Sequence, residues 1–432
     1  MEIRAPRGMQ DILPDATGRW QWVEARMRDL ARRYGCREIR TPVVEHTEVF
    51  QRGVGAGTDI VDKEMYTFAD RGGRSVTLRA EGTAPVVRAV LEHNLAATPP
   101  VRVYYICPIF RYDRPQAGRY RQHTQFGAEV IGSAEPGADA EVLSLAVRLV
   151  ETLGLRDVDV RLSSVGDAVC RPHYEEVLRA YYAPRLPELC DDCRRRFETA
   201  PMRLLDCKRE HDREVAAGAP RILDYLCDPC RQHFAGVRAH LDAMGIAYTV
   251  DPLIVRGLNY YARTAFEAVS GGLGAQNAVF GGGRYDGLAE QMGGPPTPGV
   301  GFGMGIERLL IVLEAGGAAV PAERGIDVFV ATAGTGSPHA LAIADRLRTR
   351  GLSVMTDVMG RALRSQMRQA DRAGAAWVLL LGEDEVNRGV AILREMATGA
   401  QVEVPLERVT DDVPARIRSA GGPRPDGAGV AR

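Results

Sequence analysis

Four arginines stand close together in the stretch 110–130, FRYDRPQAGRYRQHTQFGAEV, which ends in a run closed by one carboxylate, Glu129. Guanidinium groups carry a fixed positive charge and bind phosphate oxygens bidentately. The stretch therefore predicts a binding site for a phosphate-rich ligand beside a single acid, built from Arg111, Arg114, Arg119, Arg121 and Glu129. The alternative is a solvated loop whose arginines form surface ion pairs, and by itself an arginine-rich loop favours that interpretation.

Cysteines suggest a second kind of chemistry. Two Cys-x-x-Cys pairs have the spacing of a tetrahedral zinc site, namely Cys190 with Cys193 and Cys227 with Cys230. The two pairs must still converge across a gap of 33 residues, so reduced thiols are the favoured alternative to a structural zinc ion.

Glycines are concentrated between residues 271 and 305, including the run GGGRYDGL. A dinucleotide fingerprint needs such glycines between a strand and a helix of a βαβ unit, and that context is missing here. We interpret them as positions of close approach to the backbone, with ordinary turns as the alternative.

The elements that must position these residues alternate mainly as strands. The pattern predicts a helix at 20–35, a strand at 36–46, a hairpin at 65–83, and two strands around the arginine-rich loop. Strands joined by short loops indicate an antiparallel sheet, so we expect an α+β domain over residues 1–322. Residues 168–248 change to helix formers and predict a helical insertion.

Residues 325–420 alternate strand and helix and predict a separate α/β domain with a largely parallel core. Residues 421–432 lack apolar periodicity and are predicted to be disordered. The arginines at 361, 364, 368 and 372 are spaced to share one helix face, which favours RNA contact only weakly.

The composition sets limits on location and partners. The formal net charge of −1 neither suggests nor excludes a nucleic acid. The longest apolar runs are far shorter than a membrane span, and MEIRAPRGMQ does not read as a signal peptide, so we expect a cytoplasmic protein without a disulfide framework.

Five blocks resemble, in order, the motifs of class II aminoacyl-tRNA synthetases and in particular of the histidyl-tRNA synthetase family. They are RGMQDILP at 7–14, LRAEGTAP at 78–85, FRYDRPQAGRYRQ at 110–122, VRGLNYYARTAFE at 255–267 and GFGMGIERL at 301–309. The resemblance implies a homodimeric histidine–tRNA ligase that uses ATP with Mg²⁺ and acts on tRNA(His), with dimer contacts in about residues 20–44. It also implies that the C-terminal α/β domain binds the anticodon.

The resemblance assigns roles residue by residue. It makes Arg111 and Arg256 the catalytic arginines on either side of the α-phosphate. The residues that it implies for histidine are Glu81, Gly82, Thr83, Arg111, Gln125, Glu129, Arg256, Tyr260 and Tyr261, and those for ATP are Arg111, Arg119, Arg121 and Arg308. Arg114 and Gln116 match the loop that meets the acceptor end of tRNA.

The chain departs from the family pattern at a few positions, notably Asn259 and Asp113, where the family usually has Asp and Glu. Asn259 puts the orientation of Arg256 in doubt. Two other interpretations stay open: a non-catalytic paralogue of the ATP phosphoribosyltransferase regulatory subunit type, and an amino-acid-activating enzyme that loads a carrier other than tRNA.

Overall fold

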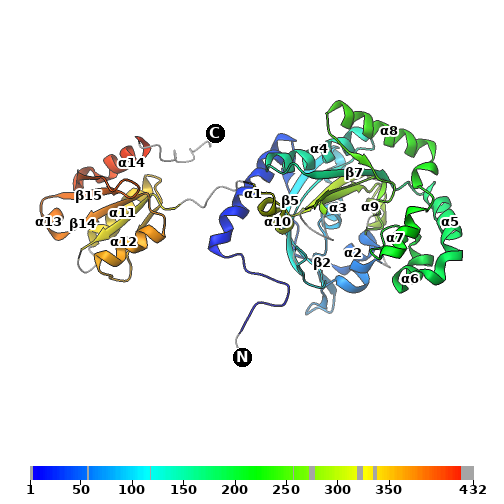
Figure 1. Ribbon diagram of the computed structural model, residues 1–432, viewed down its shortest axis with the longest axis horizontal. Coiled ribbons are helices and arrows are strands. Elements are labelled where there is room, and N and C mark those ends of the chain that lie inside the picture. Colours follow the sequence, from blue (N-terminus) through cyan, green and yellow to red (C-terminus); the bar gives the residue numbers. More distant parts are fainter. Residues whose placement is uncertain are drawn as a thin grey trace. The chain divides into compact units, whose positions relative to one another are not determined.

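The computed structural model describes residues 3–55, 58–116, 118–255, 257–271, 278–318, 325–333 and 338–419. The chain divides into two units, Met1–Pro321 and Ala322–Arg432, which are described separately (Figure 1). Among the described residues, no helix combines the length and the apolar character that crossing a membrane requires.

The first unit is built on an eight-stranded sheet with the order β1-β5-β6-β11-β10-β9-β7-β8. Neighbouring strands are antiparallel except for two parallel pairs at the edges, β1 with β5 and β7 with β8. The predicted antiparallel α+β architecture is therefore confirmed. The strands are β1 (Arg37–Glu38), β5 (Val101–Phe110), β6 (Gln122–Ile131), β7 (Val158–Ser164), β8 (Thr249–Val250), β9 (Ala262–Ser270), β10 (Ala278–Arg284) and β11 (Gly299–Gly305).

Alternation along the central strands separates two faces of this sheet. Tyr104 and Phe126 point to a large apolar core, whereas Val103 and Tyr105 belong to a second core on the opposite face. Helices α1 (Pro14–Arg33), α4 (Pro136–Thr152), α8 (Asp228–Ala243) and α10 (Ile306–Ala315) contribute to the first core. Helices α3 (Thr83–Glu92) and α9 (Leu288–Gln291) contribute to the second, next to α2 (Thr47–Val54).

The predicted strand at 36–46 is wrong as a single element. It divides into β1 and β2 (Val44–His46), and β2 joins a separate three-stranded sheet, β2-β4-β3, with β4 (Ser75–Leu78) and β3 (Thr67–Ala69). The cause is the buried guanidinium of Arg79, which donates to the carbonyl oxygens of Thr41 (2.9 Å) and Pro42 (3.1 Å). Those carbonyls are therefore not available to a continuous ladder. The hairpin predicted at 65–83 is confirmed by the antiparallel pair β3 and β4.

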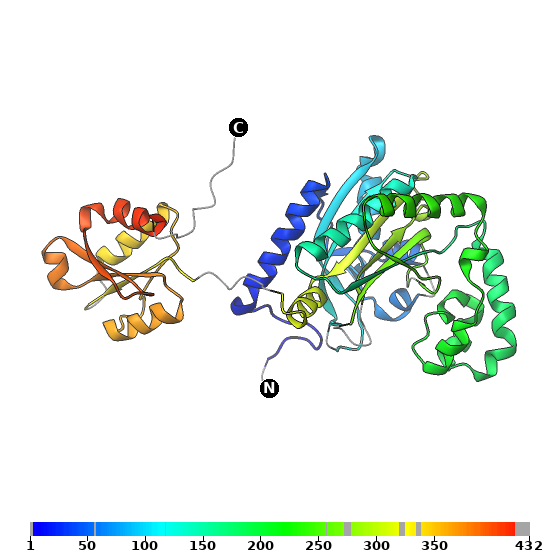
Figure 2. The ribbon, with the colours of Figure 1, turned by 45° about the horizontal axis from the view of Figure 1, so that its top comes forward.

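Helices dominate the insertion between β7 and β8, as predicted: α5 (Arg171–Tyr182), α6 (Asp191–Thr199), α7 (Glu210–Ala217) and α8. Figures 1 and 2 both show α5, α6 and α7 gathered beyond the sheet, in green. They share a small core of their own, which includes Tyr174, Leu178 and Tyr182.

The second unit has a five-stranded sheet with the order β13-β12-β14-β15-β16. Its first three strands are parallel and the last two pairings are antiparallel, so the predicted α/β domain is confirmed. Its strands are β12 (Val328–Thr332), β13 (Val354–Thr356), β14 (Trp377–Leu381), β15 (Val390–Glu395) and β16 (Gln401–Pro405), and its helices are α11 (Pro338–Thr349), α12 (Leu363–Arg372), α13 (Glu383–Asn387) and α14 (Val409–Ser419). Arg361 precedes α12 and bonds Asp357, so it does not share a helix face with the later arginines, contrary to the prediction. The predicted disordered tail lies outside the described residues.

Candidate active site

A fully buried carboxylate, Glu129, lies on β6 in the middle of the large sheet. Its Oε2 accepts a hydrogen bond from the Tyr285 hydroxyl at 2.6 Å. Its Oε1 accepts one from Thr83 Oγ1 at 2.8 Å and one from the Tyr105 hydroxyl at 3.3 Å. Three hydroxyls thus hold the acid in one orientation.

Glycines on the neighbouring strand make room for this arrangement. Gly301 stands opposite Glu129 and Gly303 stands opposite Gly127 in the ladder between β6 and β11. A Cβ on Gly301 would overlap the Glu129 carboxylate, and one on Gly303 would overlap the Gln125 amide. The glycine-rich stretch is thus a place of close approach, as interpreted from the sequence, although here the approaching groups are the chain's own side chains.

Burial governs the protonation of this pocket. It raises the pKa of Glu129 to about 8, although hydrogen bonds from Tyr285 and Thr83 oppose the shift. Burial also raises the pKa of Glu81, against the hydrogen bonds from the backbone N–H groups of Ala84 and Thr83. Thr83 connects the two acids, because its backbone N–H donates to Glu81 Oε2 at 2.8 Å while its hydroxyl donates to Glu129.

Aromatic rings pack around this buried polar cluster. Tyr260 is buried and its hydroxyl lies 3.4 Å from Glu81 Oε2 as a donor. Its ring centroid is 4.8 Å from that of Tyr261 and 5.8 Å from that of Tyr285. Tyr105 covers Gly82 so closely that a Cβ there would overlap the ring. The structure thereby groups residues that the resemblance implied for histidine: Glu81, Gly82, Thr83, Gln125, Glu129, Tyr260 and Tyr261.

The sequence analysis missed Tyr105 and Tyr285, both of which donate to Glu129. Tyr105 pairs with Gly127, two residues from Glu129 on β6, so strand alternation puts it on the face of the acid. Adjacent residues of a strand point to opposite faces, so only one of the two tyrosines in VYYIC, at 103–107, can lie on the face of Glu129. Tyr285 directly follows β10, and its position next to the glycine run was the available signal.

A cavity of about 330 Å³ is lined by the arginine-rich loop and the start of α10. It collects three of the four arginines implied for ATP. Its lining comprises Arg111, Asp113, Gly118, Arg119, Tyr120, His123, Gly305, Glu307 and Arg308.

Each arginine of the cavity has a defined partner. Arg111 Nε donates to the carbonyl oxygen of Ala80 at 2.8 Å, next to Glu81, and Arg308 Nε donates to that of Gly118 at 2.8 Å. Arg119 forms an ion pair with Asp113 and lies 3.7 Å from Glu64. These contacts fix the positive groups before any ligand binds.

Arg121 is placed differently. Its guanidinium carbon lies 3.7 Å from the centroid of the Tyr112 ring, and its Nε donates to the Asp113 carbonyl oxygen at 3.1 Å. Arg121 is not one of the described residues that line the cavity. Arg256 lies outside the described residues, so its position relative to Arg111 stays a prediction.

The electrostatic character of the cavity is cationic. Burial, together with the charges of Arg111 and Arg308, lowers the pKa of His123 to about 3, so its imidazole is neutral near pH 7. Burial raises the pKa of Glu307 to about 7, and both carboxylate oxygens of Glu307 accept the Thr124 backbone N–H, at 2.8 and 3.0 Å. Neutral His123 and partly protonated Glu307 leave the arginines as the dominant charges, which suits a polyphosphate.

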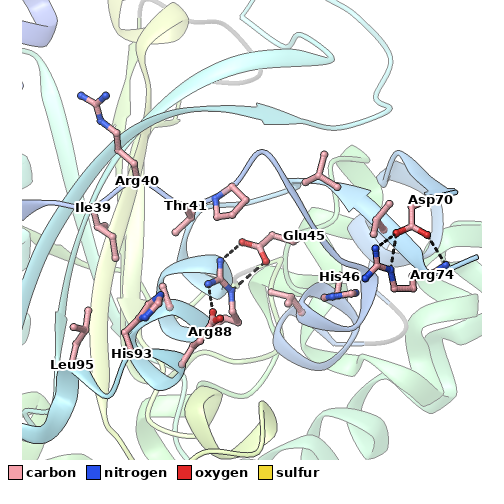
Figure 3. Close-up of a pocket in the computed structure, with 16 residues that line it drawn as sticks. Ile39, Arg40, Thr41, Glu45, His46, Asp70, Arg74, Arg88, His93 and Leu95 are labelled. Atoms are coloured by element: carbon pink, nitrogen blue, oxygen red, sulfur yellow. Dashed lines mark hydrogen bonds and ion pairs between the residues drawn. The ribbon is translucent and has the colours of Figure 1, made fainter. Parts of the chain in front are cut away.

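A larger hollow of about 690 Å³ lies elsewhere on the first unit, along the segment 39–46 (Figure 3). Its charged groups are already paired: Figure 3 shows Arg88 bonded to Glu45, and Arg74 bonded to Asp70. Of the described residues that were predicted to bind substrate, none lines this hollow. Its size alone therefore does not make it the active site.

The cysteine pairs do not converge, which corrects the prediction of one shared site. Cys190 and Cys193 lie with Cys207, whereas Cys227 and Cys230 lie with Cys170. The reason is that each pair begins a different helix, α6 or α8, and each meets a third cysteine from another segment.

An antiparallel sheet that carries an arginine-lined cavity and a buried polar cluster, together with a separate α/β domain, is the arrangement that the resemblance to class II aminoacyl-tRNA synthetases implied. The comparisons narrow this class. The family model described as "Histidyl-tRNA synthetase" matches residues 8–309, and "Anticodon binding domain" matches residues 327–416. The chain belongs to the histidyl-tRNA synthetase family.

Individual relatives agree over nearly the whole length. The chain is 52% identical over 411 residues to the histidine–tRNA ligase of Caldanaerobacter subterraneus subsp. tengcongensis, covering 95% of this chain and 99% of the relative. It is 50% identical over 421 residues to that of a Thermoanaerobacter species, covering 97% and 100%. The crystal structure of apo S. aureus histidyl-tRNA synthetase is similar with a TM-score of 0.80 and 37% identity, covering 95% of this chain and 100% of that one.

Proposed function

We propose that the chain is a histidine–tRNA ligase, which activates L-histidine with ATP to histidyl-adenylate and transfers the histidyl group to the 3′ end of tRNA(His). The observation that carries this proposal is the buried Glu129, held by three hydroxyls beside a cavity with three arginines. We assign the catalytic domain to residues 1–322, with its insertion at 168–248, and the anticodon-binding domain to 325–420. We also propose a cytoplasmic location, as expected from the sequence.

Histidine recognition follows from the donors and acceptors of the pocket. Glu129 would accept an imidazole N–H, and Tyr260 and Tyr261 would enclose the ring. Glu81, Thr83 and Gln125 would surround the α-ammonium group. A pocket that hydrogen-bonds polar atoms of its substrate rejects analogues that lack them by about 10⁴ to 10⁵.

The activation step joins two anions. A carboxylate oxygen of histidine attacks the α-phosphorus of ATP, the bond to the bridging oxygen breaks, and pyrophosphate leaves. Positive charge preorganised around that phosphate stabilises the transition state. We assign Arg111 to the α-phosphate, Arg119 and Arg308 to the remaining phosphates or the adenine, and Arg256 to the side opposite Arg111. Arg121, which the resemblance also implied for ATP, we assign to holding the loop through Tyr112 and the Asp113 carbonyl oxygen.

Mg²⁺ usually binds through one or two carboxylates together with substrate phosphates. Asp113 and Glu307 line the cavity, so the residues present fit such an ion. They would hold it against the triphosphate, where it would neutralise charge on the leaving pyrophosphate. In the free protein Asp113 is paired with Arg119, which keeps both groups in place.

The tRNA contacts belong to two regions. Arg114 and Gln116 lie in the exposed loop between β5 and β6, and Gln116 forms an isolated bridge with Arg119. We propose that this loop meets the acceptor end. A Gln116→Ala variant should lose tRNA charging while it keeps ATP–pyrophosphate exchange; an equal loss in both assays rejects the tRNA-specific role.

We also propose a homodimer formed through about residues 20–44. The hollow of Figure 3 begins in this segment, and Val44 and Leu95, which line it, are each more than 40% exposed. A Val44→Glu variant should shift the mass measured by light scattering from that of a dimer toward that of a monomer. A wild-type protein of about 47 kDa in solution contradicts this part of the proposal.

The deciding experiment is ATP–pyrophosphate exchange with each of the twenty amino acids, followed by charging of a tRNA(His) transcript. We expect exchange with histidine alone and then charging. Absence of exchange favours the regulatory paralogue, and exchange without charging favours a different carrier. Against the paralogue stand the match to the anticodon-binding family and about 50% identity to histidine–tRNA ligases along the chain.

A further inference from the structure

Two clusters of metal-ligand side chains lie in or directly before the helical insertion, and none of their members lines the arginine cavity. One comprises Asp167, Cys170, Cys227 and Cys230, and the other comprises Cys190, Cys193, Cys207 and Asp212. Within each cluster the four candidate ligand atoms lie within 4.8 Å of one another. Each cluster thus offers three sulfurs and one carboxylate oxygen, the number that a structural zinc ion needs.

The sulfur–sulfur distances match the edges of a zinc tetrahedron. A Zn–S bond of about 2.3 Å gives a tetrahedral edge of about 3.8 Å between two sulfurs. Cys190 Sγ and Cys207 Sγ are 3.8 Å apart, and Cys170 Sγ and Cys230 Sγ are 3.9 Å apart. A disulfide would require about 2.05 Å.

The carboxylate distances fit the same geometry. Combining a Zn–O bond of about 2.0 Å with the Zn–S bond gives an edge of about 3.5 Å. Asp167 Oδ1 lies 3.5 Å from Cys170 Sγ and 3.7 Å from Cys227 Sγ. In the other cluster, Asp212 Oδ2 lies 3.1 Å from Cys207 Sγ, shorter than this edge by about 0.4 Å, so that binding an ion would move the two atoms slightly apart.

The two clusters share one local design. The sequence Leu-Cys-Asp-x-Cys occurs at 189–193 and again at 226–230. The first cysteine of each copy is the N-cap of a helix with nearly the same backbone angles, φ −65° and ψ 160° for Cys190, and φ −64° and ψ 160° for Cys227. The second cysteine, Cys193 or Cys230, is buried in the first turn. Backbone N–H groups at a helix start favour the negative charge of bound thiolates.

Further contacts hold the ligands before an ion binds. The backbone N–H of Asp167 donates to Cys170 Sγ at 3.4 Å, and the backbone N–H of Cys190 donates to Asp212 Oδ2 at 3.2 Å. Arg263 Nε lies 3.9 Å from Asp167 Oδ2, where it offsets part of the excess negative charge of three thiolates and one carboxylate.

We propose that the insertion binds two structural zinc ions, one in each Cys₃Asp cluster. Their role follows from the size of the insertion, whose helices are short and whose core is small. Small domains with little apolar core commonly gain their stability from metal sites. One ion would tie the segment 167–170 to the start of α8, and the other would tie the start of α6 to the segment 207–212.

The test is elemental analysis of the full chain, purified without chelator. We expect two zinc ions per chain, one in Cys193→Ser, one in Cys230→Ser and none in the double variant. Cys36→Ser is the matched control, since Cys36 is also a buried thiol but lies outside the insertion, and it should keep two. If these variants do not fold, zinc release from the wild-type chain by an organomercurial, measured with a chromogenic chelator, gives the same count.

Three results overturn the proposal. One is wild-type protein that contains no zinc and takes up none after reduction. Another is a full zinc count in both Cys193→Ser and Cys230→Ser. The last is denatured, unreduced protein with only four of its eight thiols titratable, which indicates disulfides instead. The metal count does not depend on aminoacylation, so it stands apart from the proposed function.

Discussion

Replacing Tyr285 by Phe tests the pocket at a residue that the sequence analysis did not identify. The change removes only the hydroxyl that donates to Glu129 Oε2 at 2.6 Å. Glu129 then keeps two donors, Thr83 and Tyr105. Fewer hydrogen bonds therefore oppose the rise that burial causes in the pKa of Glu129. We expect weaker histidine recognition with unchanged ATP binding.

The magnitude follows from the kind of hydrogen bond. A hydrogen bond to a charged group contributes about 1.5–3 kcal/mol, and about 1.4 kcal/mol corresponds to a factor of ten. Above pH 8, where Glu129 is ionised, the kcat/KM for histidine should therefore fall about 10- to 150-fold in Tyr285→Phe, by conversion of that range. The KM for ATP should stay within about twofold, because Tyr285 does not line the arginine cavity among the described residues.

The free energy of unfolding should depend on pH in a direction that follows from the pKa of Glu129. The pKa of Glu129 in the folded chain, about 8, is above the ordinary value of 4.5. An acid with a raised pKa binds its proton more tightly in the folded state, so its ionisation lowers stability as the pH rises from about 4.5 to about 8. Loss of the Tyr285 hydroxyl raises the pKa further. Tyr285→Phe should therefore lose more stability, relative to wild type, at pH 9 than at pH 6.

The assay is ATP–pyrophosphate exchange at varied histidine, with thermal unfolding at both pH values. Tyr174→Phe is the matched control, because Tyr174 is equally buried and its hydroxyl donates to the Pro220 carbonyl oxygen at 2.9 Å within the insertion. It should lose stability without any change in the KM for histidine. A kcat/KM for histidine within twofold of wild type in Tyr285→Phe would refute the assignment of Glu129 as the acceptor of the imidazole.

Other predictions follow from the same geometry. Gly301→Ala should lose about 1–3 kcal/mol in denaturant unfolding and bind histidine poorly, because its Cβ overlaps Glu129; Gly271→Ala, whose Cβ would have no atom of the described residues within 4 Å, should behave like wild type. Arg119→Gln should raise the KM for ATP at least about tenfold, as expected for a lost charged hydrogen bond, whereas Arg121→Gln should change it by less than about threefold. Similar effects in both arginine variants would contradict the placement of Arg121 outside the cavity. In wild type, kcat/KM for histidine should increase toward pH 8 as Glu129 ionises, and Glu129→Gln should have a low, flat profile between pH 6 and 9; a retained increase would point to another group.

The sequence predicted those parts of the fold that depend on local patterns. Alternating apolar residues identified the antiparallel strands, and short loops between them excluded a Rossmann arrangement. The strand at 36–46 failed because a distant side chain, Arg79, takes the carbonyls of Thr41 and Pro42. Local propensity contains no information about such a partner.

The candidate site likewise contains residues that sequence motifs identify and residues that only the fold brings together. Residues in contiguous motifs, such as Glu81 and Thr83, were found from the sequence, and the structure joins them through a hydrogen bond at 2.8 Å. Tyr285 was missed because it reaches Glu129 across 156 residues of sequence. The cysteines were grouped by spacing, but which thiols meet is decided by how α6 and α8 pack, and spacing does not encode that.

The glycines of β11 have a consequence for how this enzyme can change over time. Its recognition surface depends on absent atoms, because Glu129 and Gln125 lie where Cβ atoms of Gly301 and Gly303 would be. A larger residue at either glycine overlaps the opposing side chain. Shortening that side chain first would remove a group that we propose to contact histidine. Single substitutions that would adapt the site to another amino acid are therefore unfavourable whichever strand, β6 or β11, changes first.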